Sequence, residues 1–135
     1  MTSPVIDVHT HMLTKEWVDL LGQHGGPTYE LREVRGGLRA IHMDGSPFMT
    51  PVPPMFDWPL RIQTMDKHGV DIAITSLSCP NAYWGGAEVS QRAARIMNED
   101  MAKAQKTWPE RMRWFASLDD AAFERICAVL ERTTR

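Results

Sequence analysis

Two histidines one residue apart, His9 and His11, end the strand-like segment at residues 5–11, VIDVHTH. Side chains alternate between the two faces of a strand, so this spacing predicts that both imidazoles share a face. By the same alternation, Asp7 should lie on that face, just below them. Imidazole nitrogen binds zinc and neighbouring metals, and a metal with an open position activates water or polarises a substrate oxygen. The pair therefore indicates part of a metal site, although such histidines can also stand half exposed with nothing bound.

Alternating helix and strand patterns follow the histidines and must position them. Apolar residues recur at helical spacing, and Asp, Gly and Pro residues mark the helix ends. Continuous β-branched runs indicate buried strands. Helices are predicted at residues 14–22, 57–69 and 87–107 and after Asp119 or Asp120, where Phe123, Cys127 and Leu130 form an apolar stripe, and strands at 70–77 and 111–118.

Residues 23–56 interrupt this alternation with a stretch rich in Gly and Pro. Strand-like segments are predicted at residues 29–34 and 38–43, with turns at Gly36-Gly37 and Asp44-Gly45. A segment of this length without a helix is more often a lid or a binding loop than a simple connection. The alternative is a disordered linker, which its aromatic residues and methionines disfavour.

The order of elements predicts an α/β fold with parallel strands joined by right-handed crossovers. An open doubly wound sheet would carry a Gly-rich phosphate turn after the first strand, and HTHMLTKEW at residues 9–17 contains no glycine. In a (β/α)₈ barrel, functional residues stand at the C-terminal ends of strands, where His9 and His11 are predicted to lie. The barrel therefore fits better.

Composition excludes several classes of protein. The 135 residues, 43% hydrophobic and 24% charged, suit one globular domain. A net charge of -2 gives no basic surface for nucleic acid or for a membrane, and no apolar run has the length of a membrane span. Cys79 and Cys127 form no CxxC motif and are predicted to be small buried residues in a reducing compartment. We therefore expect a cytoplasmic protein.

Four segments in the right order, covering most of the chain, carry a resemblance to a known family: IDVHTHMLTKEW, DWPLRIQTMDKHGVDIAITSLS, NAYWGG and RIMNEDMAKAQKTWPERMRWFASL. They resemble the amidohydrolase superfamily, in the branch that contains aminocarboxymuconate-semialdehyde decarboxylase. The resemblance implies that residues 1–135 are the N-terminal part of a single TIM (β/α)₈ barrel domain of the metal-dependent hydrolase type. This part would hold about three βα units and a lid-like insertion at about residues 23–56.

The resemblance also implies a metal centre. A divalent metal, zinc first and manganese as the alternative, would be held by His9 and His11 together with a histidine and an aspartate from later strands. The catalytic residues are likewise expected in strands that this chain lacks. Such barrels need about 250 residues, and relatives carry a Pro-containing stretch where Leu118 here runs straight into Asp119. A fragment or a shortened gene product is therefore expected.

Three residues are candidates for substrate binding by the same resemblance. In the aminocarboxymuconate decarboxylases, an arginine that binds a substrate carboxylate follows the phenylalanine of a D-G-x-x-F turn, and Met49 stands there in DGSPFM. Methionine cannot make the bidentate bond that a guanidinium makes, which disfavours the muconate substrate itself. Tyr83 and Trp84 match a Tyr-Trp pair near the barrel mouth, where they would cover the substrate or serve only in packing.

The function expected from these features is metal-dependent decarboxylation of a small aromatic or unsaturated carboxylic acid. One alternative is hydrolysis of an ester, lactone or amide at the same metal centre. Another is a catalytically incomplete fragment with no activity alone, since two histidines leave a catalytic zinc one protein ligand short of three. The partner would be the small-molecule acid, and the family implies a homodimer.

Overall fold

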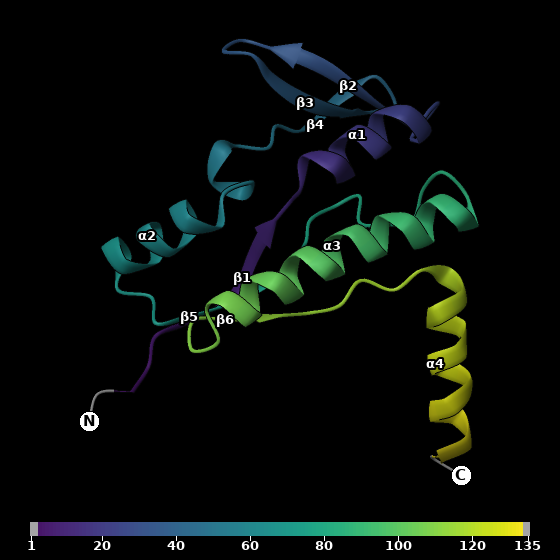
Figure 1. Ribbon diagram of the computed structural model, residues 1–135. Helices are drawn as coiled ribbons and strands as arrows, with labels where there is room; N and C mark the ends of the chain where they lie inside the picture. The colour runs from purple at the N-terminus through teal and green to yellow at the C-terminus, as the bar shows by residue number, and fades with distance from the viewer. Residues whose placement is uncertain (1–2, 134–135) are drawn as a thin grey trace.

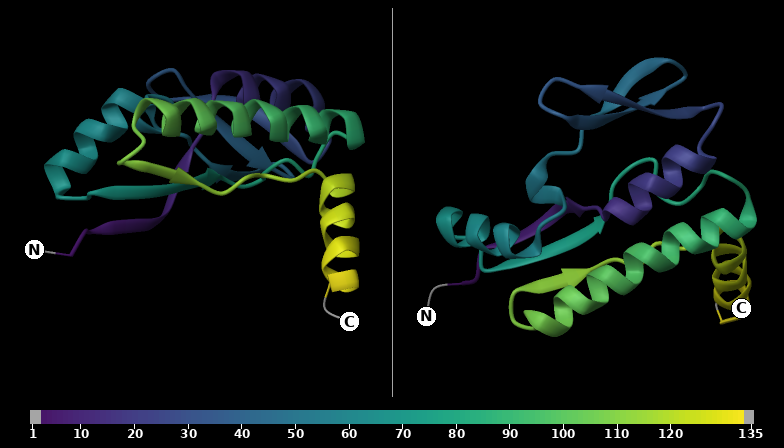
Figure 2. Two further views of the ribbon diagram at one scale, coloured as in Figure 1. Left: turned by 60° about the horizontal axis from the view of Figure 1, so that its bottom comes forward. Right: turned by 45° about the horizontal axis from the view of Figure 1, so that its top comes forward.

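The computed structural model describes residues 3–133. Its main sheet has three parallel strands in the order β1-β5-β6. Three helices lie together on one face of this sheet (Figures 1 and 2). The strands are β1 (Ile6–Met12), β5 (Ile72–Leu77) and β6 (Met112–Trp114), and the helices are α1 (Lys15–His24), α2 (Trp58–His68) and α3 (Ala87–Thr107). The predicted alternation of parallel strands and helices is confirmed.

The two faces of the main sheet differ in burial, as the central strand β5 shows. Ala73, Thr75 and Leu77 are buried beneath the helices, whereas the side chains between them, on the opposite face, are only half buried. In Figure 2, α1, α2 and α3 all lie on the first face, and α4 projects from one end of the sheet without lying across the strands. A sheet with helices on its outside and side chains lining its inside is the wall of an α/β barrel, so the predicted fold class fits this arrangement.

The largest core lies where α1 and α3 cross the sheet. Trp17 of α1 is fully buried and meets Trp84 edge to face, with ring centroids 5.7 Å apart. Tryptophan pairs in this geometry contribute more than their buried area alone. Buried residues of the insertion and of β5, including Ile41 and Leu77, join the same core. The insertion is therefore packed onto the body of the protein.

The insertion forms a second, antiparallel sheet in the order β2-β3-β4, followed by the short 3₁₀ helix η1 (Pro53–Met55). The two predicted strands are confirmed as β2 (Tyr29–Val34) and β3 (Leu38–Met43), and the predicted glycine turns join them and the next strand. The third strand, β4 (Ser46–Met49), was not predicted, and it contains Pro47, which cannot donate a backbone hydrogen bond. Its position at the edge of the sheet makes that proline acceptable.

Helix α1 continues past Gly22, where the sequence predicted its end, to His24. A Cβ atom at position 22 would lie 2.7 Å from Cδ1 of Leu31 on β2. The glycine therefore leaves room for the Leu31 side chain of the insertion sheet and does not stop the helix.

Strand β6 ends at Trp114, although the sequence predicted a strand over residues 111–118. Asn98 of α3 explains the difference. Its side-chain NH₂ donates to the Ser117 carbonyl at 2.8 Å, and its Oδ1 accepts from the Ser117 N–H, also at 2.8 Å. The Phe115 N–H still donates to the Thr75 carbonyl at 2.9 Å. Because the backbone groups of Ser117 bond to a helix side chain instead, the chain leaves β5 after Phe115.

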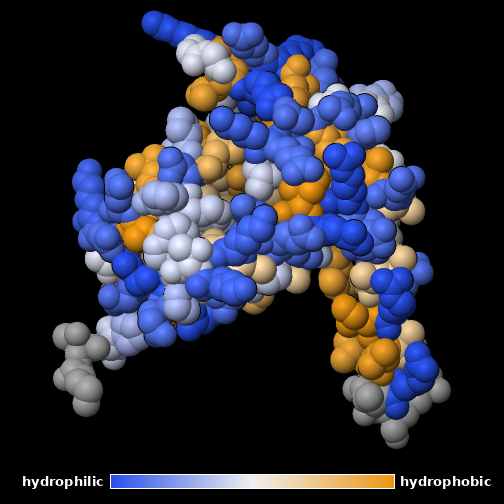
Figure 3. Space-filling view, in the orientation of Figure 1, coloured by the Kyte–Doolittle hydropathy of each residue, from blue (hydrophilic) through white to orange (hydrophobic). Residues whose placement is uncertain are grey.

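Helix α4 (Asp120–Thr133) begins where Asp119 accepts a hydrogen bond from the Ala122 N–H at 2.8 Å, so Asp119 is the predicted cap. The helix stands away from the body, and apolar residues gather on it in Figure 3. Phe123 is 55% exposed, so the predicted apolar stripe of this helix faces solvent. The burial predicted for Cys79 is also wrong, because it lies exposed in the loop after β5.

No helix in the described part of the chain is long and apolar enough to cross a membrane.

A hydrogen bond between side chains joins α2 to α3. The Trp58 indole Nε1 donates to Oδ2 of Asp100 at 2.8 Å. Burial raises the pKa of the Asp100 carboxyl, while the hydrogen bond from Trp58 and the charge of Lys103 act in the opposite direction. The ionised carboxylate is therefore less favourable in the folded chain than in the unfolded chain.

We expect Asp100→Asn to become more stable relative to wild type as the pH rises. The difference in free energy of unfolding should grow from about pH 3.8, the ordinary pKa of aspartate, up to the raised pKa of Asp100 in the folded chain. The reason is that asparagine keeps an acceptor for Trp58 but never ionises. Asp100→Ala loses the acceptor and should be destabilised by roughly 1–2 kcal/mol. Urea unfolding of the three proteins at pH 4 and pH 7 measures these differences.

Glu99→Gln, on the exposed side of the same helix, controls for the loss of one negative charge. The expectation fails if Asp100→Asn gains no more stability between the two pH values than Glu99→Gln gains.

Candidate metal site

The two histidines at the C-terminal end of β1 direct their rings to the same point. Nε2 of His9 and Nε2 of His11 lie 3.2 Å apart, and the ring planes meet at 81°. Two nitrogens at neighbouring tetrahedral positions around zinc are separated by about 3.3 Å, since each Zn–N bond is about 2.0–2.1 Å. The separation of the ring nitrogens thus fits two ligands of one metal ion, as the spacing in the sequence predicted.

Ser76 of β5 holds the ring of His11 from the other side. Its Oγ lies 3.1 Å from Nδ1 of His11, and its carbonyl oxygen lies 3.4 Å from the same nitrogen. Metal-binding histidines usually donate their second ring N–H to such an oxygen, which fixes the ring and leaves the other nitrogen for the metal. The sequence analysis did not find Ser76. The feature that could have indicated Ser76 is its position near the end of the predicted strand at residues 70–77, as a polar residue within an apolar run.

The register between β1 and β5 places Asp7 away from the histidines. Asp7 pairs with Ala73, whereas His11 pairs with Ser76. Ala73 and Ser76 are three positions apart, so they point to opposite faces, and paired residues of neighbouring strands point the same way. Between Asp7 and Thr10, β1 contains one residue more than β5. The prediction that Asp7 lies below the histidines is therefore wrong, because the extra residue reverses the alternation.

The donor set suits a transition metal but is incomplete in this part of the chain. Within residues 3–133, no group of three or more His, Cys, Asp or Glu side chains is close enough to hold an ion. Two imidazoles whose ring nitrogens converge fit zinc or manganese as partial ligands. The described residues therefore offer a converging pair of imidazoles, and no third candidate ligand among them lies close enough to join it.

The three candidate substrate-binding residues occupy different environments. Sδ of Met49 accepts a hydrogen bond from Oγ of Ser78 at 3.5 Å, which brings it beside the C-terminal end of β5. Tyr83 is 53% exposed. Trp84 is 7% exposed, and its Nε1 donates to the Asn81 carbonyl at 2.8 Å. Met49 thus lies near the end of the sheet that carries the histidines, while Trp84 forms part of the core.

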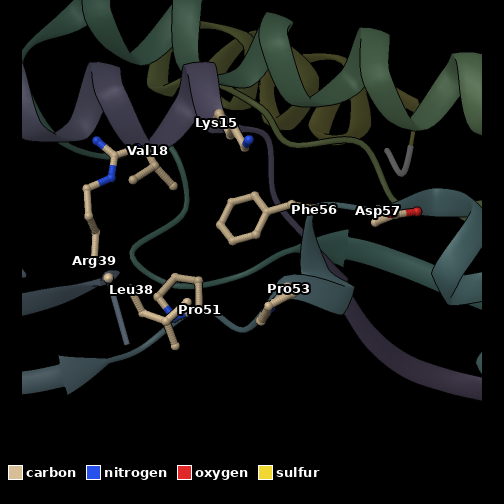
Figure 4. A pocket seen from close by; sticks show the side chains of 9 residues that line it. Lys15, Val18, Leu38, Arg39, Pro51, Pro53, Phe56 and Asp57 are labelled. Atoms are coloured by element: carbon tan, nitrogen blue, oxygen red, sulfur yellow. The ribbon is translucent and has the colours of Figure 1, made fainter. Parts of the chain in front are cut away.

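A separate cavity of about 400 Å³ lies between α1 and the insertion (Figure 4). The ring of Phe56 points into it, with Lys15 and Val18 of α1 on one side and Leu38 and Arg39 of β3 on another. Neither histidine lines this cavity. It is therefore distinct from the metal site.

Comparison with curated proteins shows a similarity to decarboxylases. No family model matches the chain. The chain is 28% identical over 109 residues to 2-amino-3-carboxymuconate-6-semialdehyde decarboxylase of Caenorhabditis elegans. The aligned region covers 79% of this chain but only 27% of that protein. The resemblance to this branch of the superfamily is confirmed, and the chain spans about a quarter of the length of this relative.

Solved structures show the same fold. The IDCase of Metarhizium anisopliae matches with a TM-score of 0.67 and 19% identity, over 84% of this chain and 34% of that one. A 5-carboxyvanillate decarboxylase from Novosphingobium aromaticivorans, solved with manganese and 4-hydroxy-3-methoxy-5-nitrobenzoic acid, matches with a TM-score of 0.60 and 15% identity, over 86% of this chain and 34% of that one. The predicted fold class, α/β with the arrangement of one part of a barrel, is confirmed by these matches.

We expect Ser76→Ala to weaken zinc binding by about tenfold, the lower end of the effect typical for removing a residue that orients a metal ligand. The reason is that the His11 ring loses the hydroxyl that fixes it. Ser78→Ala is a matched control, because this hydroxyl bonds to Met49 and touches neither histidine. Competition with a chromogenic zinc chelator measures both affinities. Equal affinities for the two variants would contradict the role given to Ser76.

Proposed function

We propose that the protein is a metal-dependent decarboxylase in which His9 and His11 supply two of the metal ligands. The carrying observation is the convergence of the two Nε2 atoms, 3.2 Å apart, at the C-terminal end of a barrel strand. Functional residues of such barrels stand at this end of the strands. The similarity to decarboxylases supports the reaction type, although this chain spans only about a quarter to a third of those proteins.

Zinc is the metal we propose, with manganese as the alternative. Either ion would supply Lewis-acid chemistry, orienting substrate oxygens and stabilising negative charge. The residues of this chain have simpler tasks. His9 and His11 present their Nε2 atoms in the same direction, and Ser76 holds the His11 ring so that its Nε2 stays available.

The substrate we propose is a small aromatic or unsaturated carboxylic acid. Met49, near the C-terminal end of β5, cannot bind a carboxylate as an arginine would. The part of the substrate that lies against this thioether should therefore be apolar, so at that point an aromatic ring is favoured over a carboxylate. We further propose that the insertion, here an ordered sheet packed on α1, acts as a lid over the substrate.

A second candidate is that residues 1–135 have no activity alone. The observation that favours it is the lack of a third metal ligand among residues 3–133. The reaction would then require ligands from further polypeptide.

Purified protein reconstituted with zinc, and separately with manganese, would be incubated with 5-carboxyvanillate as the probe substrate. We expect release of CO₂ and formation of the decarboxylated phenol, both lost in His9→Ala/His11→Ala, because the metal loses its ligands. Chromatography of the products separates this reaction from hydrolysis. Asn98→Ala, far from the histidines in sequence and bonded to Ser117, controls for general loss of stability.

The metal content of the same samples decides between the two candidates. Metal bound by wild type but not by the double variant, without any turnover, supports the inactive partial site. Wild type that binds no metal overturns the proposed metal centre.

A further inference from the structure

We propose that Arg61 of α2 is a positioning residue for the histidine pair, in that it holds the backbone at the end of β1 from which His11 projects. The inference rests on the proposed metal role of His9 and His11. Arg61 touches neither imidazole in the described contacts, so any effect on the site would be transmitted through the main chain.

The contacts of Arg61 meet β1 at two successive residues. Its Nη2 donates to the His11 carbonyl oxygen at 3.1 Å, and its Nε donates to Sδ of Met12 at 3.4 Å. The planar guanidinium presents these donors in a fixed fork. Binding one residue through its carbonyl and the next through its side chain restricts the rotation of the peptide unit between them. That unit sets the direction of the His11 side chain.

The strand is irregular close to this segment. The ladder between β1 and β5 shifts register between Asp7 and Thr10, at Val8 and His9, and regular pairing resumes only at Thr10, one residue before His11. The His9 N–H is bonded within the strand, to Oδ1 of Asp7 at 3.1 Å. The bonds from Arg61 to His11 and Met12 therefore restrain the backbone just after the irregularity.

Partial burial makes the charged form of the Arg61 guanidinium less favourable. Arg61 is half buried, and burial lowers its pKa, while the charge of Asp7 acts in the opposite direction. Placing a charged group here is less favourable than leaving it in water. Asp7, which the register removes from the histidine face, thus stands where it stabilises Arg61.

Arg111 offers a matched control at the opposite end of the same sheet. Its Nε donates to the Asp71 carbonyl at 2.7 Å, and its Nη2 donates to the Val70 carbonyl at 3.0 Å and to Asp66 at 2.8 Å. Both arginines hold main-chain carbonyls next to a strand of the main sheet. Only Arg61 does so beside the histidines.

The test compares Arg61→Met, Arg61→Lys and Arg111→Met in three measurements: thermal stability, zinc affinity by chelator competition, and the ¹⁵N resonances of the histidine rings without metal. We expect both methionine variants to lose stability. Only Arg61→Met should bind zinc about tenfold more weakly and shift the His9 and His11 ring resonances. Arg61→Lys should restore part of the affinity, because its ammonium can still donate to the His11 carbonyl.

Two outcomes would overturn the inference. One is that the affinity falls equally in Arg61→Met and Arg111→Met, in line with lost stability. The other is that the ring resonances of Arg61→Met match those of wild type. If wild type binds no zinc, the proposed metal centre fails, and the metal-free resonances still decide the role of Arg61. Should Arg61→Met not fold, the same comparison between Arg61→Lys and Arg111→Lys decides it.

Discussion

The parallel pairing of β1 with β5 is the constraint on which the rest of the site depends. It sets His11 beside Ser76 and Asp7 beside Ala73, and one extra residue in β1 separates the two pairings. If these same residues formed a regular strand without the bulge, Asp7 and the two histidines would share a face. The geometry of the proposed metal site, two converging ring nitrogens with a hydroxyl behind one ring, follows from strand register as much as from residue type.

The helices packed on the sheet restrain the end of β1 through side-chain hydrogen bonds. The bond from Trp58 to Asp100 joins α2 to α3, and α2 in turn carries Arg61 to the end of β1. A chain of contacts therefore leads from the interface between two helices to the backbone of a proposed metal ligand. Stability and site geometry are coupled here through α2.

Much of the fold could be predicted because it depends on local patterns. Asp57 and Gly69 bound α2 as the sequence indicated, and the spacing of His9 and His11 was enough to predict their convergence. What failed depended on distant partners. The position of Asp7 away from the histidines depends on the register between β1 and β5. The early end of β6 depends on the bonds from Asn98 of α3. Ser76 contacts His11 only because β5 pairs with β1. The exposure of Phe123 on α4 likewise could not be predicted, because an apolar stripe indicates only that a helix can be buried.

The edge strands of the two sheets differ in how well they discourage pairing with strands of other molecules. In the insertion sheet, Pro47 removes a donor from the edge strand β4, and the charged pair Glu30 and Arg32 lies on the other edge strand, β2. Proline and charge are the devices that discourage strands of other molecules from adding to a sheet. On the edge strand β1 of the main sheet, Ile6 and Val8 are 46% and 66% exposed. Unwanted self-association through strand addition should therefore begin at β1, and the insertion can face solvent without recruiting other chains.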